Sequence, residues 1–215
     1  HVFAVLGALT IGVTVYACRT MPEFLLRAIN WIFAHSIYRL QTKQASNLPK
    51  TGGALLVCNH VSYADACLLL AASERPIRFL MYKPIYEHRF IKPFARIAQA
   101  IPIASEANPK ELIRSLSIAR EAIKAGELVC IFAEGSLTRL GNLLPFSRGL
   151  EKIMKGVDAP IIPVHLDQLW GSIFSFHSGK FFWKVPRSLP YPVTISFGAQ
   201  LPASTPAYRV RRAVW

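Results

Sequence analysis

The chain has 215 residues, of which 52% are hydrophobic and only 17% are charged. This length is enough for one sizeable domain with a hydrophobic core. Lysine and arginine number 25 against 12 aspartates and glutamates, which gives a formal net charge of +13. A basic composition of this kind predicts an anionic partner, and the apolar excess argues against nucleic acid and for phospholipid headgroups.

The N-terminal run of residues 2–18 contains no charged residue. A membrane-spanning helix needs roughly 20 apolar residues, with a range of about 17–25, so this run lies at the short limit. Arg19 supplies the positive flank that is expected on a cytoplasmic side. We expect a membrane-inserted helix here, and a buried core helix is the alternative.

A second helix is predicted to start with Thr20 as its hydroxyl cap, Pro22 in its first turn and Glu23 three residues after the cap. Residues 24–40 then mix many apolar and aromatic side chains with a few basic ones. This content fits a helix that lies in a membrane interface, and packing against the domain would explain it nearly as well. Residues 1–41 are therefore expected to form N-terminal membrane-associated helices.

An α/β domain is predicted over residues 42–205, because short apolar runs in this region read as buried strands. These runs are residues 54–58, 77–81, 101–104, 128–133, 160–166 and 193–197. Within the fifth run, Pro163 favours an edge strand or a strand end. A helix that starts at Asn108 and stops before Gly126 separates two of the runs. Strands alternating with helical stretches predict a mostly parallel central sheet flanked by helices.

The four cysteines each lie in an apolar run and form no CxxC pair: Cys18, Cys58, Cys67 and Cys130. Cysteines that lie in apolar runs and form no CxxC pair are predicted to be buried, reduced thiols. Reduced thiols suit a protein that faces the cytosol.

The first candidate site follows the first predicted strand, where Asn59 and His60 precede Asp65. On a regular helix, two side chains five residues apart point about 140° away from each other, and on a strand they face opposite sides. A turn after His60 and a helix beginning near Ser62 would bring the imidazole and the carboxylate together at the carboxyl edge of the sheet, where ligands bind. The alternative is that residues 62–65 form only a capping box.

The second candidate site follows the strongest predicted strand. Glu134, Gly135 and Ser136 come directly after it, and Arg139 and Arg148 lie a few residues further on. Backbone N–H groups at such a turn, with guanidinium groups nearby, suit a phosphate. An ordinary polar loop would explain the same residues.

Three blocks of the sequence together resemble the glycerolipid acyltransferase family. They are N-H-x-x-x-x-D at residues 59–65, F-x-E-G at 132–135 and IIPVHLD at 161–167. The form E-G-x-L-T-x-x-G-x-L at 134–143 is most similar to the acyltransferase portion of bacterial 2-acylglycerophosphoethanolamine acyltransferase/acyl-ACP synthetase fusions. That resemblance implies an adenylate-forming domain in the full-length chain, with residues 206–215 as a basic tail or the start of a linker.

The resemblance implies transfer of a fatty acyl group from acyl-CoA or acyl carrier protein to the free hydroxyl of a lysophospholipid. It implies His60 as the general base and Asp65 as the residue that orients it, with no metal and no cofactor besides the acyl co-substrate. Imidazole ordinarily titrates near neutral pH, which suits a general base. The implied substrate-binding residues are Asn59, Glu134, Gly135, Ser136, Arg139 and Arg148. The expected location is the cytoplasmic face of an inner membrane.

The third block departs from the family pattern F-P-E-G-T-R. Ala133 replaces the proline, Ser136 the threonine and Leu137 the arginine. The family's phosphate-binding arginine therefore does not carry over, and Arg139 and Arg148 are substitutes chosen by charge and proximity. For this reason a lysophospholipid is favoured over glycerol 3-phosphate as the acceptor.

A basic nucleic-acid- or lipid-binding module without catalysis is the alternative from another class. Its support is the net charge of +13 and a basic, aromatic stretch at residues 75–96. A serine hydrolase is disfavoured because the chain has no G-x-S-x-G motif, and metal catalysis because it has no H-E-x-x-H motif.

Overall fold

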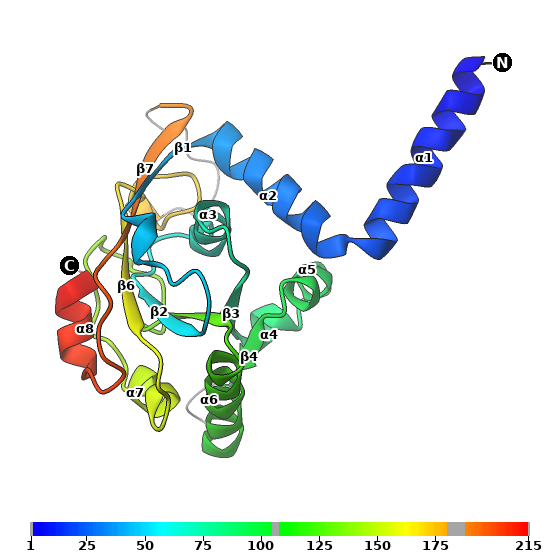
Figure 1. Ribbon diagram of the computed structural model, residues 1–215. Helices are drawn as coiled ribbons and strands as arrows, with labels where there is room; N and C mark the ends of the chain where they lie inside the picture. Colours follow the sequence, from blue (N-terminus) through cyan, green and yellow to red (C-terminus); the bar gives the residue numbers. More distant parts are fainter. Residues whose placement is uncertain (1, 105–107, 180–187, 215) are drawn as a thin grey trace.

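Seven strands form one sheet in the computed structural model, which describes residues 2–104, 108–179 and 188–214 (Figure 1). The strand order is β1-β7-β6-β2-β5-β3-β4. The strands are β1 (Tyr38–Lys43), β2 (Ala54–Cys58), β3 (Ile77–Tyr82), β4 (Ile101–Ile103), β5 (Leu128–Phe132), β6 (Ile161–Asp167) and β7 (Tyr191–Phe197). Only β6 and β7 pair antiparallel among these described strands. The predicted mostly parallel α/β sheet is therefore confirmed.

Helices cover both faces of this sheet (Figure 1). They are α1 (Val2–Thr20), α2 (Pro22–Ile37), α3 (Asp65–Ala72), α4 (Lys83–Tyr86), α5 (Lys92–Ile97), α6 (Pro109–Lys124), α7 (Gly149–Met154) and α8 (Ala207–Val214), with short 3-10 helices η1 (Ala45–Asn47) and η2 (His177–Gly179). Alternate residues of β2 belong to two hydrophobic clusters, one with α2 and α3 and the other with α6, α7 and α8. A strand buried on both faces needs a continuous apolar run, which is why ALLVC predicted β2 correctly.

The boundaries of α6 are also confirmed. Asn108 Oδ1 accepts a hydrogen bond from the backbone N–H of Glu111 at 3.3 Å, and Pro109 is the first helical residue. Gly126 follows the helix with a φ of +92°, a left-handed conformation that glycine adopts without strain. The cap and the stop signal therefore have the local geometry that their residue types predict.

The connection between α2 and the sheet differs from the prediction. Thr20 ends α1, and its hydroxyl donates to the Tyr16 carbonyl at 2.7 Å, so it does not cap α2. The helix expected to continue through residue 40 ends at Ile37, and β1 then pairs with β7. β1 was missed because its sequence YRLQTK has too few apolar residues to stand out after an apolar helix. The expected domain boundary after residue 41 falls inside β1 and stays a prediction.

One prediction for the C-terminal part is wrong. Pro163 does not mark an edge strand, since β6 lies between β7 and β2. The ladder with β7 begins at Val164, so Pro163 lies just outside it while pairing with Val57 of β2. The expected basic tail or linker contains α8, an amphipathic helix that buries Ala207, Val210 and Val214. A linker to a further domain stays a prediction.

Helix α1 projects away from the sheet, and its apolar side chains are exposed (Figure 1). Phe3 is 90% exposed and Leu6 is 54% exposed. The alternative of a buried core helix is therefore wrong for these residues. None of the described helices is long and apolar enough to cross a bilayer alone, whereas α1 and α2 meet that criterion as a pair bent by 104°. Membrane insertion of α1 stays a prediction.

Candidate active site

Two parallel strands bring the candidate residues to one edge of the sheet. β2 and β5 pair so that Cys58, the last residue of β2, lies opposite Phe132, the last residue of β5. His60 and Glu134 each come two residues after their strand has ended. They therefore lie at the same carboxyl edge, the part of an open α/β sheet where ligands bind.

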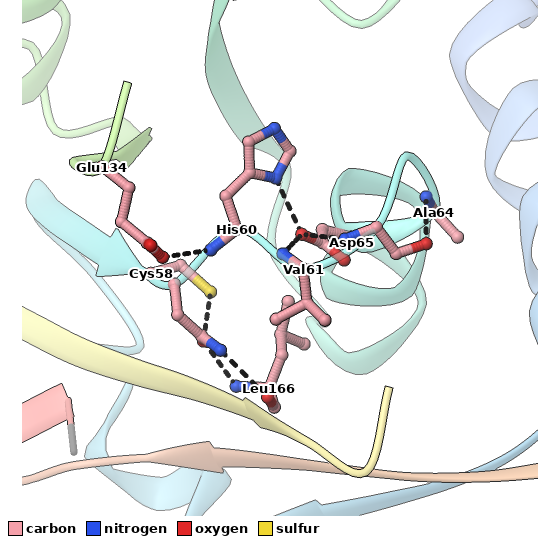
Figure 2. Close-up of polar contacts among 9 residues, drawn as sticks. Cys58, His60, Val61, Ala64, Asp65, Glu134 and Leu166 are labelled. Atoms are coloured by element: carbon pink, nitrogen blue, oxygen red, sulfur yellow. Dashed lines mark hydrogen bonds and ion pairs between the residues drawn. The ribbon is translucent and has the colours of Figure 1, made fainter. Parts of the chain in front are cut away.

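His60 and Asp65 face each other across the turn that follows β2 (Figure 2). Nδ1 of His60 lies 2.7 Å from Oδ2 of Asp65. The same oxygen accepts the backbone N–H groups of Val61 at 2.7 Å and Ser62 at 3.1 Å. The Asp65 side chain is 0% exposed and that of His60 is 23% exposed, and the second ring nitrogen points away from Asp65. The turn thus joins two side chains that regular secondary structure would keep apart.

Two bonds similar to those of a capping box are present in the same turn, although the N-cap residue of α3 is Ala64 and not Ser62. Ser62 Oγ accepts the backbone N–H of Ala64 at 3.2 Å, and Asp65 accepts the N–H of Ser62 as the acid of a capping box does. Helix α3 begins at Asp65, three residues later than expected. Asp65 therefore fixes both the backbone of the turn and the imidazole, so the two interpretations are compatible.

Burial governs the electrostatics of the pair. It raises the pKa of the Asp65 carboxyl, and hydrogen bonds from His60 and from two backbone N–H groups oppose this rise. The second oxygen, Oδ1, is buried and has no hydrogen-bond partner among the described residues. An ionised Asp65 is therefore stabilised most when the neighbouring imidazole carries a positive charge.

An aromatic stack packs against the imidazole. The ring centroids of His60 and Phe132 are 4.1 Å apart and their planes differ by 16°. Phe79 stacks on Phe132 in turn, with centroids 6.0 Å apart and planes within 15°. Stacking of this kind restricts rotation of the His60 ring. The sequence did not predict this contact, because Phe132 belongs to the F-x-E-G motif but nothing in the sequence indicates which ring it packs against.

Glu134 joins two separate backbone segments, and Figure 2 shows its contact with the first of them, at His60. Its Oε1 accepts the N–H of His60 at 2.7 Å, and its Oε2 accepts the N–H of Leu144 at 2.7 Å. Burial raises the pKa of the Glu134 carboxyl, while these two N–H groups lower it. Both carboxylate oxygens are thus engaged within the protein, and they hold the histidine turn against the loop after β5.

Asn59 was expected to contact the substrate, and its position argues for a different role. Its side chain is buried, its Oδ1 accepts the N–H of Leu166 at 2.8 Å and its Nδ2 donates to the carbonyl of Leu166 at 3.0 Å. Asn59 therefore joins the end of β2 to β6. Sequence reasoning missed this link because it depends on the register between two strands that lie far apart in the chain.

Gly135 and Ser136 lie on the turn that follows β5. Gly135 has a φ of +71°, and its N–H donates to the Phe132 carbonyl at 3.0 Å. This left-handed turn explains why glycine follows Glu134. Ser136 is exposed next to it, where its hydroxyl is accessible to a ligand.

The two candidate arginines have different relations to the site. The N–H of Thr138 donates to the His60 carbonyl at 2.9 Å, which keeps the neighbouring Arg139 near the histidine turn. The exposed Arg139 guanidinium lies 4.8 Å from the centre of the Phe176 ring. Arg148 is exposed at the start of α7, and no described contact ties it to the histidine turn. Arg148 also follows a residue that is tied to the loop after β5, since the Ser147 N–H donates to the Ala133 carbonyl at 2.8 Å, so the geometry leaves both arginines as candidates.

This arrangement can perform general acid–base chemistry. A buried carboxylate holds Nδ1 of the imidazole, and the other ring nitrogen is free to take a proton from a substrate and return it later. Such a pair at the carboxyl edge of an α/β sheet is the arrangement expected of an enzyme that activates a hydroxyl group or water.

The family is given by comparison with known proteins. The family model described as "Acyltransferase" matches residues 39–167, which is more than half of the chain. The chain therefore belongs to the acyltransferase family. The matched region contains the histidine turn, the loop after β5 and the Asn59 link to β6, and the resemblance to an acyltransferase family seen in the sequence is confirmed. The closer similarity to the acyltransferase portion of an acyl-ACP synthetase fusion stays a prediction.

Individual relatives are distant and longer than this chain. The 1-acyl-sn-glycerol-3-phosphate acyltransferase of Cocos nucifera is 26% identical over 172 residues, which cover 80% of this chain and 51% of that protein. The lyso-ornithine lipid O-acyltransferase of Brucella abortus is 26% identical over 132 residues, covering 61% and 46%. The chain thus spans about half the length of the curated relatives it matches.

The fold also has a solved counterpart. The crystal structure of the 1-acyl-sn-glycerophosphate (LPA) acyltransferase PlsC from Thermotoga maritima matches with a TM-score of 0.68 and 17% sequence identity. The match covers 96% of this chain and 84% of that one. At this identity the comparison shows a shared fold.

Glu134→Gln is expected to lower both kcat and stability. The glutamine side chain has only one oxygen, so it can accept only one of the two backbone N–H groups, that of His60 or that of Leu144. Its NH₂ group then faces the other N–H, which loses its hydrogen-bond acceptor. We expect a loss of about 1–3 kcal/mol in unfolding free energy and a fall in kcat of about 10- to 100-fold from displacement of the His60 turn. Thermal unfolding and steady-state kinetics measure both effects.

The matched control for this change is Glu121→Gln, because the Glu121 side chain is 65% exposed on α6. It should leave stability and kcat unchanged. If Glu134→Gln raised KM alone, with no loss of stability, Glu134 would bind the substrate and would not support the turn.

Proposed function

We propose that this chain is an O-acyltransferase that moves a fatty acyl group from an acyl thioester to the free hydroxyl of a lysophospholipid. The observation that carries the proposal is the 2.7 Å contact between His60 Nδ1 and the buried Asp65 carboxylate. Membership of the acyltransferase family supports the reaction class. The names of the relatives in Cocos nucifera and Brucella abortus support a lysolipid as the acceptor.

In the proposed mechanism, Nε2 of His60 takes the proton of the acceptor hydroxyl as the hydroxyl oxygen attacks the thioester carbonyl carbon. Asp65 holds the ring through Nδ1 and stabilises the imidazolium that forms. The tetrahedral intermediate then expels the thiolate as the C–S bond breaks, and the thiolate receives the proton from Nε2. The acyl group passes directly to the acceptor, so this route requires no acyl-enzyme.

The acceptor headgroup is proposed to lie over the loop after β5. Ser136 is exposed there, and Arg139 lies one residue beyond the backbone contact to His60. A guanidinium can form two parallel hydrogen bonds with a phosphate, which suits the headgroup of a lysophospholipid. Arg148 is the second candidate for this contact. The headgroup has to be tested because Leu137 occupies the position at which the family has its phosphate-binding arginine.

The remaining partners follow from the proposed reaction. The acyl donor is acyl-CoA or acyl carrier protein, and no metal or other cofactor takes part. The acceptor lies in a phospholipid membrane, and the exposed apolar side chains of α1 support membrane attachment. We place the protein at the cytoplasmic face of an inner membrane, with an adenylate-forming domain as a fused partner in the full-length chain and no role for nucleic acid.

The proposal is tested by measuring thiol release from acyl-CoA and from acyl carrier protein with purified protein in detergent. The acceptor panel contains several lysophospholipids, 1-acylglycerol 3-phosphate and lyso-ornithine lipid, and the product lipid is identified by mass spectrometry. Thiol release that requires an acceptor and yields the diacyl product is the expected result. Equal thiol release with and without an acceptor would indicate thioester hydrolysis and contradict the proposal.

A further inference from the structure

The basic, aromatic stretch noted in the sequence continues into a surface that the site does not use. This α4–α5 surface consists of residues 83–96, which form α4, α5 and the turn between them. Three apolar side chains on it are exposed: Ile85 by 36%, Phe90 by 65% and Phe94 by 57%. Exposed aromatic side chains so close together indicate a contact site.

Charge and aromatic groups form neighbouring stripes on this surface. Backbone hydrogen bonds from Lys92 to the His88 carbonyl and from Ala95 to the Ile91 carbonyl, each 2.9 Å, continue the turns of α5 back to residue 88. At about 100° per residue, positions 89, 92 and 96 fall on one exposed stripe and positions 90 and 94 on the next. A basic stripe beside an aromatic stripe is the pattern of a helix that lies in a membrane interface.

The α4–α5 surface is positively charged, with four basic residues and one acid between residues 82 and 98. Two of the basic residues form ion pairs, Lys92 with Glu87 and Lys83 with Glu111 of α6, which leaves Arg89 and Arg96 without an ion pair among the described residues. The Arg89 guanidinium lies 4.6 Å from the centre of the Phe90 ring, which keeps a cation directly above an apolar group. This combination suits an anionic headgroup above an acyl chain.

The position of the α4–α5 surface relates it to the active site. β3 is parallel to β5, so its carboxyl end at Tyr82 lies at the same sheet edge as His60 and Glu134, and α4 begins at the next residue. On its other side, α5 packs against α2, and Gln99 Nε2 donates to Glu23 Oε1 at 3.1 Å (Figure 1). The surface therefore connects the exposed face of α2 with the edge that carries the histidine.

We propose that the α4–α5 surface docks on an anionic phospholipid bilayer and is a second membrane contact besides the N-terminal helices. The proposal rests on the membrane attachment included in the proposed function. Phe90 and Phe94 enter the interface, while Arg89 and Arg96 bind headgroup phosphates. A bilayer is favoured over nucleic acid and over an acidic protein because the surface continues into the exposed apolar face of α2, where Phe24 is 65% exposed.

The charge requirement is tested with Arg89→Gln combined with Arg96→Gln. Partition of the purified protein onto vesicles is measured with phosphatidylcholine alone and with added phosphatidylglycerol. Removal of two cations from an anionic contact is expected to lower partition onto the anionic vesicles about 30-fold and to leave partition onto the neutral vesicles unchanged.

The matched control is Arg209→Gln combined with Arg212→Gln on α8, on a different side of the molecule from α5 (Figure 1). Both arginines are exposed, and Arg209 lies over the Tyr208 ring at 6.0 Å, much as Arg89 lies over Phe90. This variant loses the same charge and should partition like the wild type. Equal losses in the two variants would indicate a long-range effect of net charge and overturn the proposal.

The insertion of the aromatic stripe is tested by photo-crosslinking. The residue p-benzoylphenylalanine is placed at position 90 or 94, or at position 208 as the control, and the vesicle-bound protein is irradiated. Lipid adducts at 90 and 94 but not at 208 are expected. Bound protein without adducts at 90 and 94, or adducts only with added acyl carrier protein, would overturn the proposal. These readouts record binding without turnover, so they are independent of the proposed catalysis.

Discussion

His60→Ala is expected to abolish measurable acyl transfer while the protein remains folded. The methyl group cannot accept the proton of the attacking hydroxyl, and a positioned general base contributes about 10²- to 10⁴-fold to a rate. The His60 side chain is 23% exposed, but its loss removes the hydrogen-bond partner of the buried Asp65 carboxyl and the stack on Phe132. We expect a fall in kcat of at least about 10³-fold, measured as acceptor-dependent thiol release, with a lowered unfolding temperature but a protein that is still folded in the assay.

His88→Ala is the control for this variant, because His88 is exposed in the turn between α4 and α5 and no described contact joins it to the turn of His60. In detergent it should turn over at the wild-type rate. Turnover by His60→Ala within tenfold of the wild type would show that another group takes the proton, and the mechanism would have to be abandoned.

Asp65→Asn is expected to keep the fold and to lower kcat about 10³- to 10⁴-fold, as the loss of the orienting acid does in a serine-type triad. The new amide has nearly the same shape, and its oxygen can still accept the N–H groups of Val61 and Ser62 and the Nδ1 proton of His60, which all bond to the one oxygen Oδ2 of Asp65. The amide is neutral, however, so it no longer stabilises the imidazolium that forms when His60 takes the proton.

Thermal unfolding and steady-state kinetics together distinguish this outcome from simple disruption. The unfolding temperature of Asp65→Asn should stay close to that of the wild type, because the change also removes the cost of a buried charge. KM should change little, since Asp65 is buried and does not face the acceptor. The exposed Asp158→Asn is the control, and an equal loss of kcat in both variants would exclude a specific role for Asp65.

The fold was predictable where the local sequence pattern and the packing of the folded protein favour the same secondary structure. β2 and β5 are continuous apolar runs because both faces of the sheet are covered. α6 has a complete set of start and stop signals, and its boundaries were predicted correctly. β1 and α8 were missed because their side chains are mostly polar or charged, and only their packing partners define which face is buried.

The pairing of His60 with Asp65 could be predicted because a strand, a turn and a helix start are local features. The roles of Asn59 and Glu134 could not, because their partners are the backbone groups of Leu166 and Leu144. Any residue type except proline would supply the same N–H group at those two positions, so the partner residues contain almost no signal. Contacts from side chains to distant backbone depend on register and loop conformation, which are known only once the sheet is assembled.

The Glu134 carboxylate has a consequence for the motions of the site. It accepts the amide of the histidine and the amide of Leu144 at the same time. The loop that carries Leu144 cannot swing outward without releasing one of these bonds, so lifting that loop loosens the peptide unit that carries the base. Hydrogen exchange at the two amides should therefore speed up or slow down together as ligands are added. Movement of that loop and alignment of the proton acceptor are then coupled through a single side chain.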